Sequence, residues 1–347
     1  MVEGTGFENR HTGNRIGSSN LPLSAEYMTN RNIFIGTAVI GIILEIFLML
    51  GAPRASGAPE QFTVPRGATM QSISDTLKAQ GFIRNSLAFH IYFHIFENKK
   101  TIAPGGYYIS KSESAVTIAH TLISPPAMKW VTIPEGLRKE EIAGIFTSAL
   151  NWSSSTEAEF LADTNTNPSY IEGVYFPDTY LIPTNDTPEQ VATELVGEFN
   201  EKFAPYAQEA VNKDIKWTTA LTLASIIQRE AAGTADMPLI SGILWNRLLQ
   251  NMALDVDSTV QYARGDTPTG WWAPITSVDK QIDSPFNTYL NAGLPPHPIS
   301  NPGIAAINAA LNPATTTCLY YLHDSNRVIH CADTLDQQEN NIVKYLK

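Results

Sequence analysis

The sequence predicts an α+β protein: a membrane anchor, a small α/β subdomain, and a mainly helical domain that ends in a β-hairpin. Three observations lead to this fold class. An apolar run occupies residues 33–50, apolar residues follow a helical spacing from about residue 217, and two strand-like runs flank a polar turn near residue 325. Each pattern has the length and the period of the element that it predicts.

Composition narrows the class of protein. The chain has 347 residues, 43% of them apolar and 16% charged, which suffices for two modest domains and differs from a disordered composition. The formal net charge is -11, and no basic run with interleaved aromatic residues occurs. We therefore expect no nucleic acid among the partners of this protein.

The first fifty residues predict a tail and a membrane anchor. Residues 1–32 are polar and lack apolar periodicity, which indicates a flexible tail. Residues 33–50 can form about 27 Å of helix, enough to span a lipid bilayer once. Glu45 would cost about 2.5–3.5 kcal/mol near the bilayer centre. The alternative is a cleaved signal peptide ending near the small residues 55–58, for which the preceding tail is long.

A linker and a small α/β subdomain come next. Residues 51–60 are rich in Pro, Gly and Ala and predict the linker, and residues 61–124 predict the subdomain. Its expected elements are a strand over 61–64, a helix that presents Ile73 and Leu77 on one face and ends at Gly81, a helix from Ser86, and a strand around 107–109.

Residues 125–213 predict a connecting α/β region. We expect a strand that runs into a turn over 132–136, helices over 138–150 and 185–207, and a strand-turn pattern over 170–183. Aromatic faces stack on sugar rings, so Asp178 and Tyr180 are candidates for a binding cleft. The same run could equally form a packed hairpin.

The domain over 214–347 is organised around a helix that carries an acid. From about Trp217, the spacing places Leu223, Ile226, Ile227 and Glu230 on one face. A carboxyl on an apolar stripe either has a hydrogen-bond or ion-pair partner, or it stays protonated near neutral pH because burial removes the water that stabilises its charge. The second state is what a general acid needs, so Glu230 is the candidate acid. An ion pair near the helix end is the structural alternative.

Two helices and a rigid loop follow this helix. Asp236 can cap a helix that carries Asn246 and Arg247 beside its apolar face, and Asp257 can cap a short helix that stops before Gly265. Residues 286–289 and the Gly/Pro-rich residues 293–299 then predict a loop with little freedom to move. Binding groups are often presented on such loops.

The last segment predicts a helix over 303–311, a β-hairpin and a helix over 335–346. The hairpin runs are 318–322 and 327–331, around a turn at 324–326. With a two-residue loop at 324–325, Cys318 and Cys331 fall opposite each other at a closely spaced pair, which predicts a cross-strand disulfide. Such a bond would fit an oxidising, extracytoplasmic setting, and a shift of one residue in register would remove the match.

Other chemistries find no support in the sequence. The seven His residues show no pairing at metal-ligand spacing, and only two Cys occur. Neither a phosphate-binding loop nor a Gly-x-Ser-x-Gly elbow is present. We expect no metal and no cofactor, and a carboxylate remains the best catalytic candidate.

Several runs together resemble a known family. They are TIPEGL at 132–137, EGVYFPDTYLIP at 172–183, ASIIQRE at 224–230, NRL at 246–248, LDVDSTVQY at 254–262 and NTYLNAGLPPHPISNPG at 287–303. In this order they are similar to the motifs of the endolytic murein transglycosylase family, also called MltG or YceG-like. The resemblance covers roughly residue 60 to the C-terminus. The sequence departs from the family motif at Gln228, where family members commonly carry an acid. Glu230 is therefore the only acid in the run at 224–230.

The resemblance implies a lyase that cuts peptidoglycan glycan strands with one carboxyl. Glu230 would protonate the oxygen between N-acetylmuramic acid and N-acetylglucosamine, and the muramic acid 6-hydroxyl would close on the anomeric carbon to give a 1,6-anhydro end. The resemblance further implies a LysM-like module over 61–124, a cytoplasmic tail and an extracytoplasmic catalytic part on a single-pass membrane anchor. Its partners would be peptidoglycan synthases, whose nascent strands it shortens.

The same motifs supply candidates for substrate binding. They are Asn246, Arg247, Asp257, Thr259, Asn287, Thr288 and Tyr289, beside Asp178 and Tyr180. Two other functions stay open. A hydrolytic muramidase would use Asp255 or Asp257 as its second carboxylate. A membrane-anchored scaffold would bind glycan without cleaving it.

Overall fold

The structure, a computed structural model, describes residues 23–97, 100–166 and 171–346, and their contacts divide the chain into two compact units. The first unit takes in the described residues up to 60 together with those of 68–102 and 108–124. The second takes in 61–67, 103–107 and the described residues from 125 onward. The residues of the subdomain expected over 61–124 are divided between these two units.

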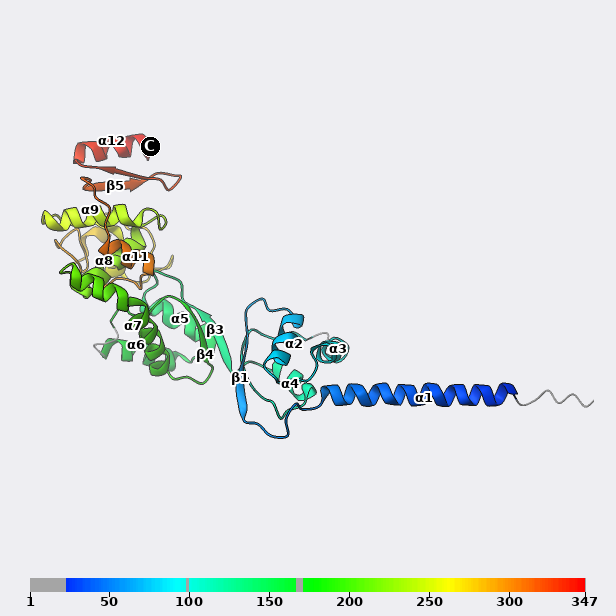
Figure 1. Cartoon of the computed structure of the whole chain (residues 1–347). Helices are drawn as coiled ribbons and strands as arrows, with labels where there is room; N and C mark the ends of the chain where they lie inside the picture. Colours follow the sequence, from blue (N-terminus) through cyan, green and yellow to red (C-terminus); the bar gives the residue numbers. More distant parts are fainter. Residues whose placement is uncertain (1–22, 98–99, 167–170, 347) are drawn as a thin grey trace, which may run out of the picture. The chain divides into compact units, whose positions relative to one another are not determined.

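Helix α1 (Leu23–Leu50) opens the described part of the first unit (Figure 1). Its residues 33–50 have a mean hydropathy of 2.6 and are not buried inside the structure, so this helix is long and apolar enough to cross a membrane. The helix begins at Leu23, within the stretch that we expected to be a flexible tail. Residues 1–22 of that tail lie outside the described residues.

Three short helices form the core of the first unit. They are α2 (Met70–Ala79), α3 (Ser86–Phe96) and α4 (Ala115–Leu122). The side chains of Thr69, Asn85 and Ser114 each accept a hydrogen bond from the first turn of the helix that follows, which is why the helices start there. Helix α4 was not expected from the sequence, because an eight-residue apolar run does not distinguish a helix from a strand.

Four strands form one sheet in the order β1-β2-β3-β4. The strands are β1 (Pro59–Val64), β2 (Gly105–Ser110), β3 (Met128–Thr132) and β4 (Thr179–Pro183), and β3 pairs antiparallel with both β2 and β4. A strand that runs into a turn was expected over 132–136, and in the structure β3 ends at Thr132 and a turn follows at residues 135–136. Of the strand-turn pattern over 170–183, only β4 is a strand, and residue 170 lies outside the described part of the chain.

Three helices accompany the sheet: α5 (Lys139–Leu150), α6 (Ser154–Thr166) and α7 (Pro188–Asn212). Phe146, Tyr175 and Leu195 lie in the core that these helices share with β3 and β4. Helix α6 was not expected from the sequence, because it is polar overall and shows no clear apolar stripe.

Helix α8 (Trp217–Glu230) is the centre of the remaining fold. It packs against α7, α9 (Met237–Leu249), α10 (Asp257–Arg264) and α11 (Ile304–Leu311), and a 3-10 turn, η1 (Asp279–Gln281), packs on α10. All eight residues from Ala220 to Ile227 are buried. A helix surrounded in this way cannot move without disturbing the core, so its last residue is held firmly in place.

The chain ends in a β-hairpin and helix α12 (Leu335–Tyr345). Strands β5 (Tyr320–His323) and β6 (Ile329–Ala332) pair antiparallel, with Tyr321 opposite Cys331. The expected two-residue loop is therefore wrong, because residues 324–328 separate the strands. The carboxylate of Asp324 accepts hydrogen bonds from the backbone N–H groups of Asn326 and Val328, which stabilises this wider loop. A disulfide nevertheless joins Cys318, just before β5, to Cys331.

Candidate active site

Helix α8 ends in three residues that each contact a different part of the second unit. The side chain of Gln228 accepts a hydrogen bond from the backbone of Gly303 at the start of α11. Arg229 donates to the backbone carbonyl of Gly136, and its guanidinium lies over the Trp272 ring, 3.8 Å from the ring centroid. Glu230 has neither contact. Its partly buried carboxyl faces a polar cavity of about 350 Å³.

The cavity is lined by acids, an arginine and residues of the C-terminal hairpin. Its lining residues include Glu230, Arg247, Asp255, Asp257, Tyr320, Tyr321 and His323. Helix α8, the start of α10 and strand β5 therefore meet at one place, although they lie far apart in the sequence. Figure 1 shows the hairpin and helices α8 and α9 in the same part of the molecule.

The carboxyl of Glu230 is bonded to a tyrosine of the hairpin. The hydroxyl of Tyr321 donates to Oε2 of Glu230 at 2.9 Å. Burial raises the pKa of Glu230 above its ordinary value, and the negative charge of Asp257 adds to the rise, whereas interactions with Ser258 and Tyr321 oppose it. Glu230 thus combines a fixed position with a raised tendency to hold its proton.

The two aspartates of the cavity are already engaged. Asp255 accepts a hydrogen bond from Arg247 at 3.1 Å. Asp257 accepts one from the hydroxyl of Tyr289 at 2.5 Å, and the ammonium group of Lys280 lies 3.8 Å from the same oxygen. Our expectation that Asp257 caps α10 is wrong, because Val256 occupies the cap position and the Asp257 side chain makes no cap hydrogen bond.

Asn246 and Arg247 hold the hairpin in place. The amide of Asn246 donates to the backbone carbonyls of Thr316 and Cys318. Arg247 is buried and donates to the carbonyls of Leu319 and Leu254 as well as to Asp255. From the sequence we expected both residues to contact substrate, and in the structure they join α9 to the segments that form the cavity.

Three further candidates bond within the protein. Thr259, Asn287 and Thr288 are buried, and the two threonine hydroxyls lie 2.9 Å apart. The amide of Asn287 donates to the carbonyls of Lys280 and Ile282. These side chains position the loop that presents Tyr289, and Tyr289 is the residue of this loop that bonds to Asp257 in the cavity.

Asp178 and Tyr180 are not brought to this cavity. Tyr180 belongs to β4 and is buried in the core, and its hydroxyl donates to the carbonyl of Phe176 at 2.6 Å. Asp178 is exposed and accepts a hydrogen bond from the backbone of Thr179. Their segment makes the packed arrangement that the sequence left open, with both residues outside the lining of the cavity.

Three of the runs that resemble the family, at 132–137, 172–183 and 287–303, meet at Asn301. Its side-chain oxygen accepts hydrogen bonds from the backbones of Gly173 and Tyr175, and its amide donates to the carbonyl of Leu137 and to the carboxyl of Glu172. The runs at 132–137 and 172–183 are therefore fastened to the loop that follows the Gly/Pro-rich segment. This role is structural and could not be read from the spacing of the runs.

Sequence reasoning missed Tyr321 as a site residue. The only available signal was its alternation in the predicted strand, which places it on the face opposite Tyr320 and Leu322. No group of three or more His, Cys, Asp and Glu side chains in the described residues comes together as a metal ion would require. The arrangement defines a candidate acid–base site, with one carboxyl at the end of a buried helix.

Comparisons with known proteins identify the family. The model of the YceG-like family matches residues 62–344, and the chain therefore belongs to this family. The endolytic murein transglycosylase of Bacillus subtilis is 29% identical over 82% of this chain and 84% of its own length. That of Streptococcus pneumoniae serotype 2 is 27% identical over 82% of this chain, and the chain spans 58% of the length of this relative.

A solved structure agrees with this assignment. A crystal structure of a yceG-like protein from Listeria monocytogenes has a TM-score of 0.56 and 28% sequence identity, covering 82% of this chain and 98% of its own. The family that the sequence motifs resemble is thus confirmed.

Proposed function

We propose that this protein is an endolytic lytic transglycosylase that cleaves peptidoglycan glycan strands, with Glu230 as its catalytic acid. The observation that carries the proposal is the Glu230 carboxyl, which faces a polar cavity from the end of a buried helix and has a raised pKa. Such an acid keeps its proton for a leaving oxygen near neutral pH. The relatives named above are endolytic murein transglycosylases.

In the proposed reaction, one carboxyl serves twice. Glu230 gives its proton to the oxygen between N-acetylmuramic acid and N-acetylglucosamine as the bond from that oxygen to the anomeric carbon breaks. The 6-hydroxyl oxygen of the muramic acid bonds to the anomeric carbon, and its proton passes to the Glu230 carboxylate. The acid is regenerated, no water is consumed, and the new end carries a 1,6-anhydro ring.

The contacts of the two aspartates support the lytic route over hydrolysis. A hydrolase needs a second carboxylate that acts as a base or a nucleophile. Asp255 is held by Arg247, and Asp257 is held by Tyr289 and Lys280. Both carboxylates are thus occupied by cationic or hydroxyl partners within the protein.

We also propose that residues 33–50 anchor the chain in the cell membrane with the second unit on the extracytoplasmic side. The apolar span supports the anchor, and the disulfide between Cys318 and Cys331 fits an oxidising compartment. In this location the enzyme would cut strands as peptidoglycan synthases extrude them, and so limit their length. The LysM-like module expected over residues 61–124 belongs to the same proposal and would add affinity for glycan.

The test uses the full chain in detergent with uncrosslinked glycan strands, and mass spectrometry of the products. Wild type should release fragments with 1,6-anhydro ends, and Glu230→Gln should reduce the rate by at least ~100-fold, within the range for loss of a general acid. Glu201→Gln is the matched control, because Glu201 is an exposed acid on α7, away from the cavity lining.

Other products would change the assignment. Reducing ends in place of anhydro ends would identify a hydrolytic muramidase. Binding of strands without cleavage by wild type would identify a glycan-binding scaffold. Equal rates for wild type and Glu230→Gln would remove Glu230 from its proposed role.

A further inference from the structure

Helix α3 carries an apolar stripe that stays largely exposed in the described part of the chain. Leu87, Ile91 and Ile95 are spaced by four residues, so they share one face, and they are 65%, 49% and 61% exposed. Phe89 and Phe93 lie on the opposite face and are buried in the first unit. The helix is therefore apolar on two faces, of which its own domain uses one.

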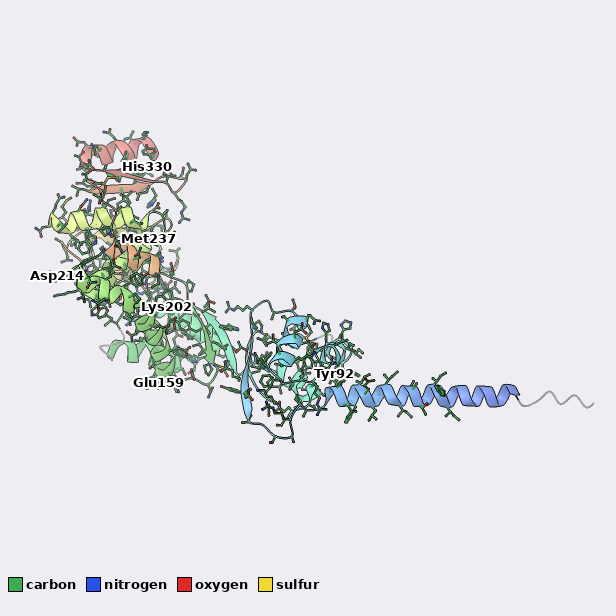
Figure 2. All side chains as sticks on the ribbon, viewed as in Figure 1. Tyr92, Glu159, Lys202, Asp214, Met237 and His330 are labelled. Carbon is green, nitrogen blue, oxygen red and sulfur yellow. A yellow bond between two sulfur atoms is a disulfide. The ribbon has the colours of Figure 1, made fainter. Side chains whose placement is uncertain are left out.

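The exposed stripe is continuous with the apolar helix α1. A cavity of about 450 Å³ lies between the two helices, lined by Ile46, Met49 and Leu50 of α1 and by the stripe of α3. Tyr92 of α3 lines the same cavity and is labelled in Figure 2, beside the end of α1. The surface that α3 exposes thus adjoins the surface that α1 would present to lipid.

Arg84 fastens the two helices together. Its guanidinium donates to the carbonyl of Leu48 at 3.2 Å and to that of Ala52 at 2.6 Å. The last carbonyls of a helix have no partner within the helix, so an arginine there satisfies them and holds the junction. Both helices belong to the first unit.

This junction sets the depth and direction of α3. Ile46 and Leu50 are part of the span 33–50, so the stripe lies beside the last turn of that span, within about 6 Å of its end at ~1.5 Å per residue. In Figure 1, α1 runs along the plane of the picture while α3 is seen down its axis, so the helices cross steeply. If α1 crosses a bilayer, α3 lies along the bilayer surface.

We propose that α3 is an interfacial helix whose apolar stripe enters the outer acyl layer of the membrane beside α1. The occupant of the stripe is the acyl chains of the lipid bilayer. Helix α3 contains no Asp, Glu, Lys or Arg that would oppose insertion, and His90 and His94 flank the stripe as polar groups. The consequence is a first unit that rests on the membrane in one orientation. The inference rests on the proposed anchor.

The test is site-specific fluorescence of the full chain in lipid vesicles. The two native cysteines form a disulfide, so one added cysteine can be labelled alone. An environment-sensitive dye is attached to Ile91→Cys on α3, to Asp75→Cys on the exposed face of α2, or to Phe47→Cys in α1. Quenching by lipids with brominated acyl chains is then compared among the three positions.

We expect quenching at position 91 to be at least threefold stronger than at position 75 and comparable to that at position 47. Weak quenching at both 91 and 75, with strong quenching at 47, would overturn the inference and leave the anchor intact. Weak quenching at position 47 as well would overturn both the anchor and this inference. The catalytic role of Glu230 would be unaffected, because the cleavage assay tests it separately. If the dye at position 91 enters an apolar environment only after a second membrane protein is added, the stripe binds a protein and not lipid, and the proposal is overturned.

Discussion

The hydroxyl of Tyr321 donates a hydrogen bond to Oε2 of Glu230 at 2.9 Å and joins strand β5 to the last residue of helix α8. The two residues are 91 positions apart. Across the hairpin, Tyr321 pairs with Cys331, which is covalently bonded to Cys318. The proposed catalytic carboxyl is therefore positioned by a cross-linked element from the end of the chain.

Tyr321→Phe removes this hydrogen bond and keeps the ring. We expect kcat for strand cleavage to fall about tenfold, because a hydrogen bond to a charged group is worth about 1.5–3 kcal/mol. The bond lowers the pKa of Glu230, so its loss should move the alkaline limb of the plot of kcat against pH to higher pH. Initial rates measured across pH test both effects.

Tyr320→Phe is the matched control for this change. Tyr320 is the neighbouring residue, and its ring lies near the guanidinium of Arg247, a contact that phenylalanine retains. The alkaline limb of the plot of kcat against pH for Tyr320→Phe should coincide with that of wild type. An unshifted alkaline limb for Tyr321→Phe would show that the Tyr321 hydroxyl has no influence on the Glu230 carboxyl.

Reduction of the disulfide should weaken the site. The bond closes a loop between residues 13 positions apart, for which about 3 kcal/mol of stabilisation is typical. We expect dithiothreitol, or the paired change Cys318→Ser with Cys331→Ser, to lower kcat and to increase hydrogen exchange of β5. Dithiothreitol should not change the kcat of the double variant, which has no disulfide. A lower kcat of that variant in dithiothreitol would mean that the reductant acts on something other than this bond.

Asp257→Asn should shift the titration of Glu230 in the opposite direction to Tyr321→Phe. The negative charge of Asp257 raises the pKa of Glu230, so its removal lowers that pKa and moves the alkaline limb of the plot of kcat against pH to lower pH. Asp255→Asn provides the comparison, since Asp255 lines the same cavity but is paired with Arg247. Equal shifts in both variants would point to a general loss of charge.

Glu172 should make stability depend on pH. Burial raises its pKa from 4.5 to about 7, and the charge of Glu140 adds to the rise. The unfolded chain releases this proton near pH 4.5 and the folded chain only near pH 7. The free energy of unfolding should therefore fall as the pH rises between these values, by about 3 kcal/mol at ~1.36 kcal/mol per pKa unit.

Denaturant unfolding of wild type and Glu172→Gln across that pH window measures this loss. The variant should show a flatter dependence, because glutamine has no proton to release. Glu201→Gln, at an exposed position of α7, should keep the slope of wild type. Parallel curves for wild type and Glu172→Gln would contradict the expected titration.

Local patterns predicted the helices of the core but few of the contacts at the site. Helix α8 was expected from about Trp217 to Glu230 and has these bounds, because its apolar residues recur at helical spacing. The register of the hairpin was not predictable, since the side chain of Asp324 bonds to the backbone of its own loop and widens it. The loop length depends on a hydrogen bond that residue spacing does not show.

The sequence alone determined that an acid stands at the end of an amphipathic helix, that residues 33–50 can span a membrane, and to which family the chain belongs. These depend on the order of neighbouring residues, which the sequence contains directly. Only the tertiary structure decided that Tyr321 bonds to Glu230, that Thr259 and Thr288 bond to each other, and that Tyr180 packs in the core. Those contacts join residues far apart in the chain, and packing and burial select them from many partners of similar chemistry.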